Sequence, residues 1–304
     1  MMKLGRDTGR IDSAAGSFRQ DRSMSDRVLY QKLDDMKRRL GEMGRVAVAY
    51  SGGADSAFVL RVAMDVLGAD NVVAVTGRSD SLAGEELAAA ARVAADLGVE
   101  HVVLDTHEFD NPEYLANPHN RCYFCKATLY STMQRFLASR RRAQIVSGTN
   151  VDDLGDWRPG LQAADEHSVR SPAAEAGLTK QDIRRLSGEF GLPTFDKPAS
   201  PCLSSRVPYG EPITPEKLRM IEAAERCLRD HGFRECRVRH HGDLARIEVP
   251  VESIPRLVEP QRRRLIDSTL RQIGYAHVAI DLRGFRSGSL NEVIAFGQRQ
   301  VPST

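Results

Sequence analysis

The stretch VAVAYSGGADSAFVL, residues 46–60, constrains the fold of this chain more than any other segment. An apolar run ends at Tyr50, two glycines follow, and a second apolar run begins after Ser56. The first run predicts a short buried strand, and the second predicts a helix that starts at the glycine-rich loop. At such a junction the backbone N–H groups and the helix dipole attract anions. The sequence therefore predicts a phosphate site between this strand and this helix.

The residues of the loop narrow down the kind of phosphate site. Gly52 and Gly53 permit a tight turn and close approach of a phosphate. Ser51 and Ser56 can donate hydroxyl hydrogen bonds, and Ser56 also suits a helix start. The lysine of the P-loop and the glycine spacing of the dinucleotide fingerprint are both absent. The remaining pattern S-G-G-x-D-S resembles the pyrophosphate loop of the N-type ATP pyrophosphatases, in which Asp55 would suit a Mg²⁺ ion that neutralises the phosphates.

Strands and helices alternate along the first half of the chain. Apolar runs predict strands at residues 45–50, 71–77, 99–105 and 143–148, and periodic patterns predict helices at residues 26–43, 56–67, 84–97 and 123–139. This alternation is typical of an α/β fold, a parallel sheet with helices on both faces, which resembles the adenine nucleotide alpha hydrolase fold. Ligands of such sheets bind beyond the carboxyl ends of the strands, where we expect Thr76, Arg78 and Gly148 to line the ATP site.

We expect the chain to comprise a leader and two domains. Residues 1–25 are rich in Gly, Ser, Arg and Asp, which is typical of a disordered leader. Residues 26–206 are expected to form the ATP pyrophosphatase domain, which ends with a proline-punctuated loop. Residues 207–304 are expected to form a small α/β domain that binds substrate and takes part in a homo-oligomer. In this part Thr214 and Pro215 predict the start of a helix.

The composition argues against some classes of partner. The 304 residues include 43 Lys and Arg against 41 Asp and Glu, a formal charge of +2, which gives no overall attraction to nucleic acid or to an anionic membrane. No run approaches the roughly 18 apolar residues of a membrane span, and the N-terminus lacks the apolar core of a signal peptide. We therefore expect a cytoplasmic protein, whose five cysteines are thiols, metal ligands or catalysts rather than disulfides.

Three of the cysteines stand in segments that suggest chemistry. Cys122 and Cys125 form the pair CYFC, a pattern found in zinc, redox and iron–sulfur sites and also as two buried thiols. A closed zinc site needs four ligands, and the chain has no second C-x-x-C pair. Cys202 lies in the loop PASPCLSSR, which we expect to fold back over the nucleotide site. The other two cysteines, Cys227 and Cys236, are expected to pack in the core.

Five segments in order make a resemblance to one family specific. They are SGGADS, NRCYFCK, SGTNVDDLGDWRPG, KPASPCLSSRVPYG and DLRGFRSGSLNE. Together they resemble the ATP-dependent sulfur transferases of the LarE family, over about residues 26–300. That family sulfurises pyridinium-3,5-biscarboxylic acid mononucleotide, the precursor of the nickel-pincer cofactor of lactate racemase.

The resemblance implies a two-step reaction with ATP, Mg²⁺ and a small nucleotide substrate. A substrate carboxylate attacks the α phosphate of ATP, and a sulfur nucleophile then displaces AMP to give a thiocarboxylate. In one branch of the family a cysteine matching Cys202 gives up its own sulfur and becomes dehydroalanine. In the other branch three cysteines hold a [4Fe–4S] cluster whose fourth iron carries the sulfide. The presence of Cys122 and Cys125 beside Cys202 favours the cluster branch, with the sacrificial cysteine as the alternative.

Cationic side chains are needed to bind a substrate that carries carboxylates and a phosphate. Arg206 lies close to Cys202, and Arg237 and Arg239 alternate along a predicted strand, which places both on one face. The alternative is a solvated strand face. Lys197 and Arg206 are also expected to lower the pKa of Cys202. Glu225 could orient these arginines or bind a metal ion, and Glu248 forms a similar pair with Arg246 one strand on, so both are candidates for the substrate site.

The sequence also offers further candidate residues and two alternative functions. Asp152 and Asp153 are candidates for Mg²⁺ or substrate binding, and His240 and His241 are expected at the surface. A tRNA thiolase with a similar loop and similar cysteines is the main alternative function. Its expected signs, a zinc-ribbon cysteine pair, an RNA-binding appendage and a basic net charge, are absent from the sequence. A nucleotide sensor without catalytic activity is a third possibility.

Overall fold

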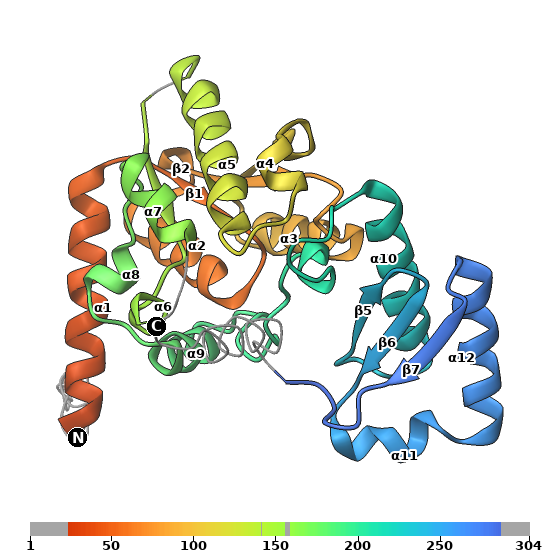
Figure 1. The fold of residues 1–304 in the computed structure, drawn as a ribbon. Coiled ribbons are helices and arrows are strands. Elements are labelled where there is room, and N and C mark those ends of the chain that lie inside the picture. The colour runs from red at the N-terminus through yellow and green to blue at the C-terminus, as the bar shows by residue number, and fades with distance from the viewer. Residues whose placement is uncertain (1–23, 141, 156–158, 287–304) are drawn as a thin grey trace, which may run out of the picture.

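A four-stranded parallel sheet forms the centre of the larger part of the molecule (Figure 1). The computed structural model describes residues 24–140, 142–155 and 159–286. The strands are β1 (Val46–Ala49), β2 (Val72–Arg78), β3 (Glu100–Asp105) and β4 (Gln144–Ser147). Their order is β3-β2-β1-β4, and every neighbouring pair is parallel. The predicted α/β fold with a parallel sheet is confirmed, and each strand lies within two residues of its predicted position.

Helices cover both faces of this sheet, as predicted. Side chains of β1 alternate between two cores, since Val46 and Val48 face one and Ala47 and Ala49 face the other. The longer helices are α1 (Met24–Met43), α2 (Ala54–Leu67), α3 (Gly84–Asp96), α5 (Arg121–Ala138), α7 (Pro159–Glu166) and α9 (Lys180–Glu189). Three single-turn helices are α4 (Pro112–Leu115), α6 (Val151–Leu154) and α8 (Pro172–Glu175). Helices α1, α2, α3 and α9 pack on one face, and α5 and α7 pack on the other.

A second, smaller sheet follows the proline-rich loop and forms a separate lobe in Figure 1. Its strands are β5 (Arg237–His241), β6 (Leu244–Glu248) and β7 (His277–Ile280). The pair β5–β6 is antiparallel and the pair β6–β7 is parallel, so this sheet is mixed. Helices α10 (Pro215–Asp230), α11 (Ile254–Leu257) and α12 (Pro260–Ile273) supply the rest of its core.

The helix that opens this lobe begins where the sequence predicts. The Thr214 hydroxyl accepts a hydrogen bond from the backbone N–H of Lys217, and Pro215 occupies the first helical position. At the other end of the chain, α1 begins at Met24, two residues inside the predicted leader. Residues 1–23, most of that leader, lie outside the described residues, as do residues 156–158 and 287–304, which carry parts of two motifs.

The expectation that His240 lies at the surface is wrong. His240 is 3% exposed, and its Nδ1 lies 3.2 Å from the hydroxyl oxygen of Tyr275. Strand β5 is covered on both faces, by the helical core on one side and by the segment around Ser205 on the other. Polar alternation along the strand therefore does not mark a solvated face here.

Burial makes the stability of the protein sensitive to mild acid. Desolvation, followed by the charge of Lys217, lowers the pKa of His240, and desolvation also lowers the pKa of His101 and His241. Because the unfolded chain binds protons more readily at these sites, the free energy of unfolding should be highest above about pH 6.5 and fall below it. The variant His240→Gln should show a smaller slope, by at most about 1.4 kcal/mol per pH unit. Urea unfolding between pH 5 and pH 8 measures this slope, and an unchanged slope would contradict the assignment.

Candidate active site

The loop between β1 and α2 has a shape that requires glycine. Gly52 has a φ of 71°, in the left-handed region, and a Cβ there would lie 2.7 Å from the Cβ of Ala90 on α3. Gly53 is the N-cap of α2 and has no side chain with which to cap it. The N–H groups in the first turn of a helix lack intrahelical partners, so they remain available for a ligand.

The two serines of the loop have different positions. Ser56 is buried, and its hydroxyl donates to the carbonyl oxygen of Gly53 at 3.2 Å and accepts from the backbone N–H of Ser51 at 3.3 Å. Ser51 is exposed, and its hydroxyl lies 3.1 Å from that of Ser56. Ser56 therefore holds the loop together, while Ser51 is accessible to a ligand. Asp55 stands half-buried in the first turn of α2.

The end of β4 packs directly against this loop. A Cβ at Gly148 would lie 2.7 Å from the backbone nitrogen of Ser56, so glycine permits the strand to end against the helix. At the end of β2, the Thr76 hydroxyl donates to the carbonyl oxygen of Tyr50 at 2.7 Å and lies 2.8 Å from Nε2 of His101. Since the single hydroxyl proton is used, His101 must carry a proton on Nε2. Thr76 is buried beneath the loop, whereas Arg78 is exposed and pairs with Asp105 at 2.7 Å.

The three cysteines that the sequence singles out are free thiols from two segments. Cys122 and Cys125 lie one turn apart at the start of α5, and Cys202 precedes the short 3₁₀ helix η3 (Leu203–Arg206). One contact joins these two segments directly, and a second joins η3 to the preceding helix α4. The guanidinium of Arg121 donates to the carbonyl oxygen of Ser204 at 3.0 Å, and the Ser204 hydroxyl lies 2.8 Å from that of Tyr114.

Electrostatics shows that the three thiols share one environment. Cys122 keeps an exposed surface, but the protein atoms around its Sγ desolvate it and raise its pKa, and a negative charge on Cys202 would raise it further. The pKa of Cys125 is raised by burial, then by the charge of Glu108 and by Cys202. Arg121 and Lys126 act in the opposite direction on Cys122. The three sulfur atoms therefore lie within range of one another's charge.

Lys197 and Arg206, which were expected to lower the pKa of Cys202, contact other groups instead. Lys197 donates to the carbonyl oxygen of Gly52 at 3.1 Å and pairs with Glu86 at 2.7 Å. Arg206 is buried, and its Nε lies 2.8 Å from a carboxylate oxygen of Glu225. Neither contact involves the Cys202 thiol.

The segment from residue 197 to residue 206, which we call the strap, touches both lobes. Lys197, its first residue, contacts the glycine loop, and the backbone N–H of Leu203 donates to the carbonyl oxygen of Ser81 at 2.8 Å. The carbonyl oxygen of Ala199 accepts from Arg237 at 2.8 Å. Cys202 comes five positions after Lys197, so their Cα atoms lie at most about 18 Å apart. The strap thus links Cys202 to the glycine loop through a short stretch of chain.

The arginines and glutamates of the smaller lobe form buried pairs. Arg239 lies 2.8 Å from Glu248, which is fully buried, and its Nη1 also donates to the carbonyl oxygen of Ser205. Glu225 accepts from Arg206 and from the backbone N–H of Val238 at 3.1 Å. Both carboxylates thus orient arginines, which is one of the two roles expected of Glu225 from the sequence. Arg237 donates to backbone carbonyl oxygens and lies over the ring of Phe285.

Several residues at the site were not foreseen as functional. Arg121 and Lys126 flank the cysteine pair in the sequence, so the motif NRCYFCK itself was the available signal. Glu108 gave no such signal. It is 2% exposed, accepts hydrogen bonds from the hydroxyls of Ser81 and Thr106, and acts on Cys125 through its charge.

Asp152 and Asp153 have local structural roles instead. Asp153 forms a capping box with Asn150 at the start of α6 and pairs with Lys180 at 2.9 Å. Asp152 accepts from the backbone N–H of Lys180 at 2.6 Å. Neither arrangement needs a metal ion.

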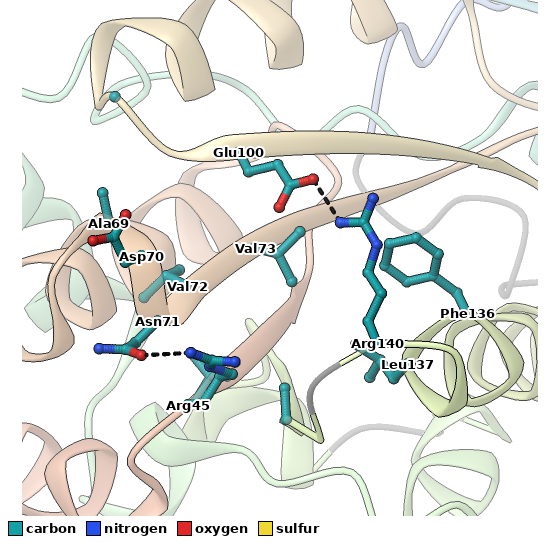
Figure 2. A pocket seen from close by; sticks show the side chains of 13 residues that line it. Arg45, Ala69, Asp70, Asn71, Val72, Val73, Glu100, Phe136, Leu137 and Arg140 are labelled. Atoms are coloured by element: carbon teal, nitrogen blue, oxygen red, sulfur yellow. Dashed lines mark hydrogen bonds and ion pairs between the residues drawn. The ribbon is translucent and has the colours of Figure 1, made fainter.

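A cavity of about 560 Å³ lies at the opposite edge of the sheet (Figure 2). It is lined by residues at the amino ends of the strands, including Arg45, Val72 and Glu100. Both of its arginines have partners within it, Arg45 with Asn71 at 3.0 Å and Arg140 with Glu100 at 2.7 Å. This cavity is far from the carboxyl ends of the strands and from the three cysteines, so it is not the active site.

The described residues contain neither a gathered metal site nor a membrane-spanning helix. No three or more His, Cys, Asp or Glu side chains there are gathered so as to hold a metal ion. No helix in the described part of the chain has the length and apolar character needed to span a bilayer.

Known proteins match both the loop and the chain as a whole. The NAD synthase family matches residues 29–144, which contain the sheet strands β1 to β3 and the glycine loop. Pyridinium-3,5-bisthiocarboxylic acid mononucleotide synthase of Lactiplantibacillus plantarum is 39% identical over 85% of this chain and 93% of its own length. This chain belongs to the LarE family of PP-loop ATP pyrophosphatases. An uncharacterised protein of Synechocystis is 46% identical to this LarE homologue, over 88% of this chain and 99% of its own length. A tRNA-specific 2-thiouridylase of Xanthobacter autotrophicus is 30% identical, over about half of each chain.

The close contact at Gly148 gives a first test of how the end of β4 packs against the glycine loop in this LarE homologue. The variant Gly148→Ala should lower the free energy of unfolding by about 1–3 kcal/mol, because its Cβ would collide with the backbone at Ser56. Gly155→Ala is the matched control, since Gly155 has a φ of −86° and no atom within 4 Å of the added Cβ. Urea unfolding measures both, and equal stability of the two variants would contradict the packing argument.

The buried pair at Glu225 gives a second test. The variant Glu225→Gln should lower the free energy of unfolding by about 3–5 kcal/mol, because Arg206 would stay buried without its counter-charge. Glu216→Gln on the same helix removes an exposed partner of Arg219 and should leave the melting temperature unchanged. A melting temperature for Glu225→Gln equal to that of Glu216→Gln would show that the buried pair does not hold the lobes together.

Proposed function

We propose that this protein is an ATP-dependent sulfur transferase that acts on pyridinium-3,5-biscarboxylic acid mononucleotide. It would adenylate a substrate carboxylate and convert it to a thiocarboxylate, with release of pyrophosphate and AMP. The observation that carries the proposal is the strap, because it joins the glycine loop through Lys197 to the segment that bears Cys202. The name of the Lactiplantibacillus plantarum relative supports the choice of substrate.

The glycine loop would perform the first half of the reaction. The substrate carboxylate oxygen attacks the α phosphorus of ATP, and the bond from that phosphorus to the β-phosphate oxygen breaks. The N–H groups at the start of α2 and the exposed hydroxyl of Ser51 would bind the departing pyrophosphate. Asp55 would help to hold a Mg²⁺ ion, since a half-buried carboxylate directly after a phosphate loop is a suitable oxygen ligand. Thr76 and Gly148 would support the loop from below, and Arg78 would reach the adenosine.

Cationic side chains of the strap and of the smaller lobe would bind the substrate. Arg206 of the strap and Arg237 and Arg239 of β5 would supply guanidinium groups suited to carboxylate and phosphate oxygens. Glu225 and Glu248 hold two of them in fixed orientations. Arg237 donates to the backbone carbonyl oxygens of Cys236 and Ala199 rather than to a carboxylate, so we expect it to contribute most directly to substrate binding.

Cys122, Cys125 and Cys202 would hold a [4Fe–4S] cluster in the second half of the reaction. Three free thiols from two tied segments lie within range of one another's charge beside Arg121 and Lys126, but they are not gathered as a metal site in the described structure, so cluster binding would draw them closer together. When bound, a cluster with three protein thiolates supplies one iron that can carry a transferable sulfide. The protein side chains around it would keep the thiols partly shielded from water, and the strap would bring Cys202 to the activated carboxylate.

Two alternatives differ in chemistry. In the first, the Cys202 sulfur attacks the acyl adenylate and AMP leaves; loss of the Cys202 Cα proton to a base and cleavage of its Cβ–S bond then release the thiocarboxylate and leave dehydroalanine. In the second, the substrate is a tRNA, an alternative that the similarity to tRNA-specific 2-thiouridylases keeps open. Co-purification of tRNA with salt-sensitive affinity would favour the tRNA alternative.

Iron and sulfide content tests the cluster. Anaerobically reconstituted protein should contain about four iron atoms per chain and release pyrophosphate when given ATP and the pyridinium dicarboxylate. Changing any of Cys122, Cys125 or Cys202 to Ser should lower the iron content, because each removes a ligand. Cys227→Ser, a buried thiol of the other lobe, is the control that should keep it.

The same samples distinguish the two sulfur sources. Iron-free protein that stays fully active and loses the mass of one sulfur per turnover would overturn the cluster and favour the sacrificial Cys202. Protein that releases no pyrophosphate with the pyridinium substrate would contradict the proposed substrate altogether.

A further inference from the structure

We infer that Lys197 binds the phosphate chain of ATP from outside the glycine loop and supplies the cation that the loop lacks. The inference rests on the proposed function, because it assumes that pyrophosphate is formed in this loop. Its basis is a contact between segments 145 residues apart, in which the Lys197 ammonium lies 3.1 Å from the carbonyl oxygen of Gly52. Lys197 thus reaches the residue that forms the tight turn of the loop.

The charges of the loop create a need for such a cation. The loop and the first turn of α2 contain one charged side chain, Asp55, and it is acidic. Helix dipoles contribute only about half an elementary charge at their N-termini. A departing pyrophosphate carries several negative charges, so a mobile ammonium at the rim would stabilise it.

Glu86 explains why the ammonium stays at the loop. Its carboxylate, in the first turn of α3, lies 2.7 Å from the Lys197 nitrogen, and the two side chains are 22% and 25% exposed. Lysine has three donors on a flexible stem, so it can keep the contact with Glu86 while it turns one N–H toward a phosphate oxygen. The ion pair with Glu86 therefore keeps the Lys197 ammonium beside the predicted phosphate site.

The position of Lys197 in the strap links the phosphate to the sulfur-bearing segment. Cys202 lies five positions further along the chain. Hydrogen bonds at Ala199 and Leu203 hold the backbone of the strap between Lys197 and Cys202 in place. A Lys197 that contacts the phosphate chain would hold the strap against the loop for as long as pyrophosphate is bound.

Binding of three ligands tests the inference. The ligands are magnesium pyrophosphate, magnesium ATP and AMP, and isothermal titration calorimetry measures their affinities. The variant Lys197→Met should bind pyrophosphate and ATP at least about tenfold more weakly, because an ion contact to a phosphate is lost. AMP lacks the β and γ phosphates, so its affinity should change less than about twofold.

Lys217→Met is the matched control. Lys217 is 23% exposed and likewise donates to one backbone carbonyl oxygen, that of Pro212, and pairs with one carboxylate, Glu211, at 3.6 Å. It belongs to α10 in the other lobe and should leave all three affinities unchanged. Lys197→Arg keeps the charge and should retain most of the pyrophosphate affinity.

The outcomes separate this inference from the proposed function. Wild-type pyrophosphate affinity in Lys197→Met would overturn the inference while the function stands. An equal loss of pyrophosphate and AMP binding with a lowered melting temperature would also overturn it, because it would mark the lysine as a structural tether. A wild-type protein that binds neither pyrophosphate nor ATP would contradict the proposed function and this inference together.

Discussion

The buried ion pair between Arg206 and Glu225 is the interaction on which the arrangement of the site depends. Each side chain is 3% exposed, so both charges have lost their water and need each other. The same guanidinium donates to the carbonyl oxygens of Pro201 and Cys202, and the same carboxylate accepts from the first strand of the smaller sheet. One pair therefore fixes the strap, the cysteine and the second lobe relative to one another.

The parts of the fold that follow from local pattern could be predicted. The glycine loop, its strand and its helix are specified within fifteen residues, and the strands fall within two residues of their expected positions because apolar runs and turn residues are local signals. The cysteines were found for a similar reason, since a C-x-x-C pair and a proline-bracketed cysteine are visible in the chain. What they face is set by tertiary contacts, such as that of Arg121 with Ser204.

The residues that the sequence misplaced are those whose surroundings come from distant segments. His240 stands between Arg239 and His241 and so looks like a surface residue, but it shares the core-facing side of β5 with Val238, and Tyr275 comes from 35 residues away. Lys197 stands near Cys202 in the sequence, yet its ammonium reaches a loop 145 residues earlier. Glu108 carries no motif, and only the fold brings it to Cys125. Sequence proximity was a poor guide to electrostatic partners in each case.

The thiol environment bears on which cysteine can act as a nucleophile. Burial and neighbouring negative charge raise the pKa of Cys122 and Cys125, so both are mainly neutral thiols in the free protein. The thiolate is the reactive form, and metal coordination deprotonates a thiol directly. Under the proposed function these two cysteines therefore suit the role of ligands better than that of nucleophiles. Cys202 is then the residue whose role differs between the two sulfur sources, as a cluster ligand in one and as the sulfur donor in the other.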